Sequence, residues 1–176
     1  MRMRKARIPA AAVVVLVSSL AGAGLLCAQE KPGDKGETAE AKKLRGRATA
    51  PTAADVDAAA TLDAMLAKND KAAFSESKGA TIEGWVVQAE REEDGDFHLS
   101  LAKATGENDA HKWVIVEVAP AWQKRSAALS PEALRKLPGT RVRVTGWLYW
   151  EPDEEQGDPR GTRWEIHPVT AIAPAR

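Results

Sequence analysis

Three side chains of the types that bind metal ions or move protons are spread along the sequence, at His98, Glu117 and His167. Two imidazoles and one carboxylate form a ligand set that zinc and non-haem iron use. Metal sites usually show tighter local spacing, such as H-E-x-x-H, whereas these residues are scattered. The alternative is a hydrogen-bonded arrangement in which Glu117 holds His98 or His167, and the scattered spacing favours this structural role.

A second group of residues combines aromatic rings with guanidinium groups, and its members are Trp85, Arg141, Arg143, Trp147 and Tyr149. Aromatic rings interleaved with arginine stack on nucleic-acid bases or on sugars. This group therefore predicts a binding surface for a single-stranded nucleic acid or an oligosaccharide. The alternative is an apolar patch that a preceding helix covers through Leu62, Met65 and Leu66.

Catalytic motifs are missing from the sequence, which contains neither G-x-S-x-G nor a phosphate-binding loop. Its one cysteine, Cys27, lies in an N-terminal apolar stretch and supplies no nucleophile once that stretch is removed. We therefore expect a protein that is not an enzyme and needs no cofactor. A divalent metal ion is the one cofactor that its histidines would suit.

Alternating apolar and polar residues predict five strands, over residues 80–90, 97–101, 112–118, 141–150 and 163–172. A short helix between the third and fourth strands begins at Ser130-Pro131, a capping residue followed by a proline suited to the first turn. Gly84 and Gly146 interrupt two strands, as happens where strands coil sharply. This β-β-β-α-β-β order predicts a mainly β fold, a small five-stranded OB-like barrel with an N-terminal helix packed on it.

Strand alternation divides the side chains between two faces of such a barrel. The core face takes Phe97, Leu99, Leu101, Val114, Val116, Val118, Val142, Val144, Leu148, Trp164 and Ile166. His98, Glu117 and His167 point outward on strands that neighbour one another, so we expect them to converge. Pro168 lacks an N–H group, so we expect a sheet edge or a bulge beside His167.

Residues 1–28 have the three parts of a secretory signal peptide. An apolar run over about residues 8–26 follows a basic start made of Arg2, Arg4, Lys5 and Arg7, and a cleavage site follows Ala28. We therefore expect an exported bacterial protein, periplasmic or secreted, that contacts a membrane only through an uncleaved signal segment. Lipidation of Cys27 is the alternative to its removal, although Leu26 is larger than the residue such a signal prefers.

Residues 29–51 are rich in Lys, Glu, Gly, Ala and Thr and lack aromatic rings, which predicts a disordered linker. Residues 52–78 predict a helical lead-in, with the helix over 52–68, and residues 79–176 predict the OB-like domain. The chain has 25 basic and 25 acidic residues; four basic residues lie in the signal peptide, so the remainder has 21 and a net charge of −4. This balance argues against nucleic acid as the partner without excluding a local basic stripe.

The segments KGATIEGWVV, ALRKLPGTRVRVTGWLYW and TRWEIHPVTAI together resemble a group of uncharacterised exported bacterial proteins. The shared signature is K-G-A-x-I-x-G, then R-V-T-G-W-L, then W-E-I-H-P-V, and it extends over about residues 61–172. The resemblance implies an OB-like domain and no particular activity. An export signal followed by a barrel is also loosely similar to the periplasmic bacterial OB-fold family, in fold alone.

Together these features favour an exported, non-enzymatic OB-fold binding or interaction module for an unknown protein or oligomeric ligand. Its binding face would be the outer side of the second and third strands with their flanking loops, where this fold usually binds. One alternative is a metal-binding protein that uses His98, Glu117 and His167. The other is a binder of single-stranded nucleic acid or oligosaccharide that uses the arginine and aromatic group.

Overall fold

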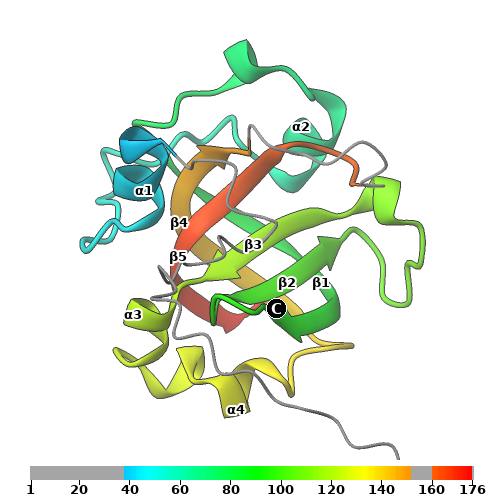
Figure 1. Cartoon of the computed structure of the whole chain (residues 1–176). Coiled ribbons are helices and arrows are strands. Elements are labelled where there is room, and N and C mark those ends of the chain that lie inside the picture. Colours follow the sequence, from blue (N-terminus) through cyan, green and yellow to red (C-terminus); the bar gives the residue numbers. More distant parts are fainter. Residues whose placement is uncertain (1–37, 152–159, 176) are drawn as a thin grey trace, which may run out of the picture. The chain divides into compact units, whose positions relative to one another are not determined.

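A computed structural model describes residues 38–151 and 160–175 of the chain. Their strands form a closed barrel in the order β1-β2-β3-β5-β4 (Figure 1). The strands are β1 (Gly79–Arg91), β2 (Phe97–Ala102), β3 (Val114–Val118), β4 (Arg141–Trp150) and β5 (Trp164–Pro174). Neighbouring strands are antiparallel except β3 and β5, which are parallel. The predicted mainly β, OB-like barrel is therefore confirmed, whereas the predicted signal peptide and residues 29–37 lie outside the described residues.

The barrel interior is filled by the apolar side chains that strand alternation predicts. Each of the predicted core residues is buried, and each belongs to one hydrophobic cluster that also contains Ile82, Val86 and Val169. Trp164 is the largest fully buried side chain, and its ring meets the rings of Phe74 and Trp150 edge to face. This packing confirms the predicted inward faces of the second, third, fourth and fifth strands.

Short helices close the two ends of the barrel. In Figure 1, α2 (Leu62–Ala67) lies at the top, and α3 (Pro120–Gln123) and α4 (Pro131–Leu134) lie at the bottom. Leu62 and Met65 of α2, and Leu134 of α4, are buried in the core cluster. The remaining short elements are 3-10 turns, η1 (Lys71–Ala73), η2 (Ala110–Lys112) and η3 (Ala127–Leu129). Among the described residues, no helix has the length and apolarity required to cross a membrane.

The predicted helix over 52–68 is wrong in its first half, because helix α2 begins only at Leu62. Two aspartates form turns in the preceding segment instead. The Asp55 carboxylate accepts from the backbone N–H of Thr52, at 2.8 Å, and the Asp57 carboxylate accepts from that of Ala59, at 2.9 Å. Aspartate side chains that bond nearby backbone groups compete with helix formation, which accounts for the shorter helix.

Residues 38–51 also differ from the predicted disordered linker. They begin with helix α1 (Ala39–Arg45), which Thr38 caps by accepting from the N–H of Ala41. The segment then continues along the barrel to Pro51, and we call residues 38–51 the strap. Its composition cannot supply a hydrophobic core of its own, so its order comes from contacts with the barrel.

Strand β5 contains an extra residue beside Pro168. Leu148 of β4 pairs with Ile166, and Gly146 pairs with Val169, so β5 advances three residues where β4 advances two. This is the bulge expected beside His167, and the His167–Pro168 peptide bond is cis. Gly146 lies against the bulge, where the two strands approach closely.

A side chain at Gly146 should destabilise the barrel. A Cβ atom there would overlap the Ile166 side chain and lie 2.5 Å from the Pro168 carbonyl oxygen. Since backbone must shift to relieve this overlap, we expect Gly146→Ala to lower the free energy of unfolding by about 3–4 kcal/mol, measured by urea denaturation.

Gly106→Ala is the matched control, because Gly106 has a φ of 71° and no atom within 4 Å of the added Cβ. Only the left-handed backbone conformation penalises this substitution, by about 1–2 kcal/mol. An equal loss in the two variants would contradict close packing at Gly146.

Candidate functional site

The barrel brings the three predicted residues together around one carboxylate. Glu117 of β3 is paired directly across from His98 of β2, and its Oε1 lies 3.0 Å from His98 Nε2. On its other side, Oε2 of Glu117 lies 2.5 Å from Nδ1 of His167 on β5. The predicted convergence is confirmed, and Glu117 holds both imidazoles rather than one.

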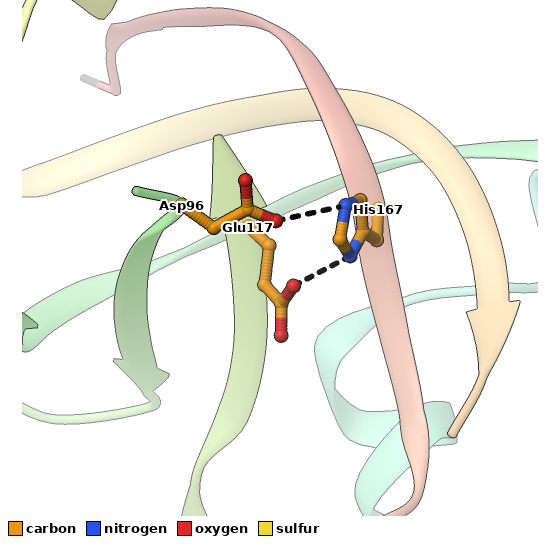
Figure 2. Close-up of side chains that lie close together, drawn as sticks. All are labelled: Asp96, Glu117 and His167. Atoms are coloured by element: carbon orange, nitrogen blue, oxygen red, sulfur yellow. Dashed lines mark ion pairs between the residues drawn. The ribbon is translucent and has the colours of Figure 1, made fainter. Parts of the chain in front are cut away.

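A fourth member of this group, Asp96, was missed by the sequence reasoning. Its Oδ2 lies 3.3 Å from His167 Nε2, so the imidazole ring lies between two carboxylates, one at each nitrogen (Figure 2). Asp96 directly follows the Asp94-Gly95 turn and directly precedes β2. Acidic residues are common in such turns, and the sequence contained no signal that separated this one from its neighbours. We call Asp96, His167, Glu117 and His98 the buried polar chain.

Most of the buried polar chain is shielded from solvent although its side chains point away from the barrel core. Glu117 is 3% exposed and His167 1% exposed. The strap supplies part of the cover, because Arg45 reaches Asp96 at 3.5 Å and Glu117 at 3.8 Å. The ring of Tyr149 packs edge-on against His167, with 5.8 Å between centroids. Alternation therefore predicted the direction of these side chains correctly, but not their burial.

The residues of the buried polar chain compensate one another's charge. Burial alone would raise the pKa of Glu117, but the charge of His167 and the hydrogen bond from His98 outweigh burial and hold that pKa well below its usual value. Burial opposes charge on His98, yet the hydrogen bond and charge of Glu117 raise the pKa of His98 above 6.5. Burial raises the pKa of Asp96, and the charge of His167 opposes this rise only in part.

A second ion pair, between Glu165 of β5 and Arg160, lies beside the buried polar chain. Glu165 is completely buried. Burial and the charge of Glu117 raise the pKa of Glu165 well above 4.5, although Arg160 opposes the rise. Strand alternation predicted that the Glu165 side chain points away from the barrel core, and it does. Tyr149 and Trp150 of β4 pair with this part of β5, and the Glu165 side chain is enclosed.

The buried polar chain consists of paired charges, and a metal ion among them would require its ligand atoms to move apart. Two ligand atoms on a tetrahedral zinc ion lie about 3.3 Å apart when each is about 2.0–2.1 Å from the metal. The contact between His167 Nδ1 and Glu117 Oε2 is shorter, at 2.5 Å. The two nitrogens of His167 also face different carboxylates, Nε2 facing Asp96 and Nδ1 facing Glu117 (Figure 2). His98 is not among the described residues whose ligand atoms lie within 4.8 Å of one another.

A small groove of about 150 Å³ lies over the outer face of β1, β2 and β3. Its lining residues are Gln88, Glu90, His98, Ser100, Ala110, Trp113, Ile115 and Arg160. His98 is the point at which the buried polar chain reaches this groove. The Trp113 indole N–H is buried and lacks a hydrogen-bond partner. The groove thus combines an aromatic ring, an unsatisfied donor and several polar side chains.

The predicted arginine and aromatic group is largely engaged within the protein. Arg141 and Arg143 both pair with Glu83, at 3.2 and 2.5 Å. The Trp147 indole N–H donates to the Thr49 carbonyl at 2.7 Å, so the strap covers that ring.

Tyr149, also of this group, is buried at 3% exposure, and Trp85 is half-buried on β1. The alternative, in which Leu62, Met65 and Leu66 of a preceding helix cover this group as an apolar patch, is wrong about which residues cover it. The covering residues belong to the strap, whereas Leu62 and Met65 pack in the core cluster.

The pH dependence of stability should report on His98, which faces Glu117, Glu92 and Arg160. Because its pKa is raised above 6.5 on folding, the resulting stabilisation is complete below pH 6.5 and is lost as the pH rises through the folded-state pKa. We expect the difference in unfolding free energy between wild type and His98→Gln to be widest in acid and to narrow as the pH rises above 6.5 through the raised pKa of His98. A difference independent of pH would contradict the coupling between His98 and Glu117.

Comparisons with known proteins identify no family for this chain. No family model matches it, and no curated protein matches its sequence. Entamoeba histolytica asparaginyl-tRNA synthetase has a similar region with a TM-score of 0.41 and 17% identity, covering 60% of this chain and 22% of that one. A chain of the S. pombe Stn1-Ten1 complex has a TM-score of 0.37 and 15% identity, covering 58% of this chain and 64% of that one. This chain spans less than two thirds of either protein, and the OB-like fold is established by the strand order of the barrel itself.

Proposed function

We propose that this protein is an exported, non-enzymatic binding module whose ligand occupies the groove over β1, β2 and β3. The observation that carries this proposal is the groove itself, with Trp113 and His98 in its lining. The outer face of the second and third strands is where OB barrels commonly bind oligomeric ligands. The signal-peptide pattern of residues 1–28 supports export to the periplasm or the exterior.

The lining of the groove suits an uncharged polar ligand, of which an oligosaccharide is the chemical class that fits. Trp113 and Ile115 offer apolar surface, and Gln88, Glu90 and Ser100 offer hydrogen-bonding groups. Aromatic rings beside amide, hydroxyl and carboxylate groups stack on sugar rings and bond their hydroxyls. The cationic groups of the groove already face carboxylates, His98 facing Glu117 and Arg160 facing Glu165. A phosphate backbone would have to compete with those carboxylates.

The position of His98 favours binding over acid–base catalysis. Its Nε2 lies 3.0 Å from Glu117, and its Nδ1 lies 3.6 Å from Glu92. A general base needs a nitrogen directed at the substrate, and both nitrogens of His98 face carboxylates. The buried polar chain therefore acts as a support that fixes the ring at the edge of the groove.

Chemical-shift mapping with named probes tests this proposal. We expect soluble cello- or chito-oligosaccharides to shift the Trp113 indole N–H and the backbone amides around Ser100. Trp113→Ala should weaken binding about fivefold or more, because losing a stacked aromatic ring costs about 1 kcal/mol or more. Trp85→Ala, which removes a half-buried tryptophan of β1 outside this lining, is the matched control.

Two results would contradict a non-enzymatic module that binds its ligand in the groove. Hydrolysis of the oligosaccharide by the purified protein would show that it is an enzyme. Shifts produced by a single-stranded oligo-dT probe and centred on Arg143 and Trp147 would instead favour the surface of β4 as the binding site.

Metal binding is the second candidate function, favoured by one observation. Asp96, Glu117 and His167 each offer one ligand atom, and these atoms lie within 4.8 Å of one another. These three residues replace the set His98, Glu117 and His167 that the sequence suggested. An ion would supply positive charge between the two carboxylates, in place of the charge on His167.

Metal analysis of protein purified without a histidine tag tests this candidate. Binding predicts about one zinc or manganese ion per chain, and loss of that ion in His167→Ala. His111→Ala is the control, because this exposed histidine is not among the three residues and its loss should leave the metal content unchanged. Absence of metal from the purified protein, together with an unchanged melting temperature after zinc or manganese is added, would exclude metal binding as the function.

A further inference from the structure

The strap is held to the barrel through its own backbone. Three successive carbonyls accept hydrogen bonds from side chains of the barrel: Arg47 from the Trp122 indole at 2.9 Å, Ala48 from Arg125, and Thr49 from the Trp147 indole at 2.7 Å. Backbone carbonyls are present in every polypeptide. Donors that bind consecutive carbonyls therefore recognise an extended chain without regard to most of its side chains.

Arg45 and Arg47 of the strap lie on either side of Gly46, and their contacts make the binding specific for particular side chains. Arg45 lies among three carboxylates, 3.5 Å from Asp94, 3.5 Å from Asp96 and 3.8 Å from Glu117. This pattern provides an anionic subsite for one guanidinium group.

Arg47 occupies a different kind of subsite. Its guanidinium lies over the Trp147 ring, 4.5 Å from the centroid, and donates to the Glu76 carbonyl at 2.6 Å. A guanidinium over an indole face is a favourable cation–π arrangement. Together the two subsites bind two arginines that are separated by one residue, which is the pattern Arg-x-Arg.

The strap itself contributes little apolar burial. Of residues 38–51, Ala41 alone is buried, and the carbonyl-bearing residues Ala48 and Thr49 are exposed. Polar contacts near a surface form and break with small changes in free energy. The strap is thus a segment that another chain of the same chemistry can replace.

We propose that this face of the barrel is a binding site for peptides with the pattern Arg-x-Arg, and that residues 45–49 of the chain's own strap, which begin at the last residue of helix α1, occupy it in cis. The site is formed by Trp122, Arg125 and Trp147 with the carboxylates of Asp94, Asp96 and Glu117. None of these residues lines the groove over β1, β2 and β3, so the proposal does not depend on the function proposed there. A tethered segment competes at a high effective concentration, so a partner peptide binds well only when the strap is weakened.

A labelled peptide with the sequence of residues 42–52 is the probe, and fluorescence anisotropy measures its binding to the full chain. The variant Arg45→Ala/Arg47→Ala weakens the strap but leaves every barrel donor and carboxylate in place. We expect this variant to bind the peptide at least about tenfold more tightly than the wild-type chain. A peptide in which both arginines are replaced by alanine should lose this binding.

Lys103→Ala/Lys136→Ala is the matched control, because it removes two surface cations that pair with Asp63 and Glu132, away from the strap. It should bind the peptide as weakly as wild type. If the double arginine variant shows no cooperative melting, the single variant Arg47→Ala replaces it. Equal affinity of the strap variant and wild type for the peptide, or equal affinity for the two peptides, would overturn the proposal.

Discussion

The buried carboxylate of Glu117 is the interaction on which the arrangement around it depends. An ionised carboxylate at 3% exposure is costly unless opposite charge lies against it. His98 and His167 supply that charge from the two neighbouring strands, and Arg45 adds to it from the strap. Glu117 thereby links β2, β3, β5 and the strap. Removing any of these partners leaves the Glu117 carboxylate, at 3% exposure, with less compensating charge.

This linkage relates the two candidate binding faces to each other. His98 lines the groove, and Arg45 belongs to the strap, yet both contact the same carboxylate. Coupling between sites requires a shared element that each site can bias, and Glu117 with its partners is such an element. Displacing Arg45 would shift the charge balance that holds His98 in the groove. Measuring peptide affinity with and without groove ligand gives the size of that coupling.

The barrel was predictable from the sequence because strand alternation and strand order are local patterns. Phe97, Val116 and Trp164 pointed inward for that reason, and Pro168 indicated the bulge since it lacks an N–H group. Asp96 was missed because its role arises only when β5 places His167 against it. The strap was missed because hydrophobic content is the usual sign of order, and Trp122 and Trp147 order it through carbonyls that every sequence shares. The burial of Glu165 likewise depends on residues distant in the chain.

Closure of the barrel limits the ways in which a partner can attach. An open sheet offers an unpaired strand edge, to which an extended peptide adds as a further strand. In this barrel each strand has a neighbour on both sides, since β1 pairs with β4 and β3 pairs with β5. An extended peptide must therefore be held by side chains, and tryptophan and arginine donors take over the task that a strand edge performs elsewhere. Aggregation through edge-to-edge pairing is suppressed by the same closure.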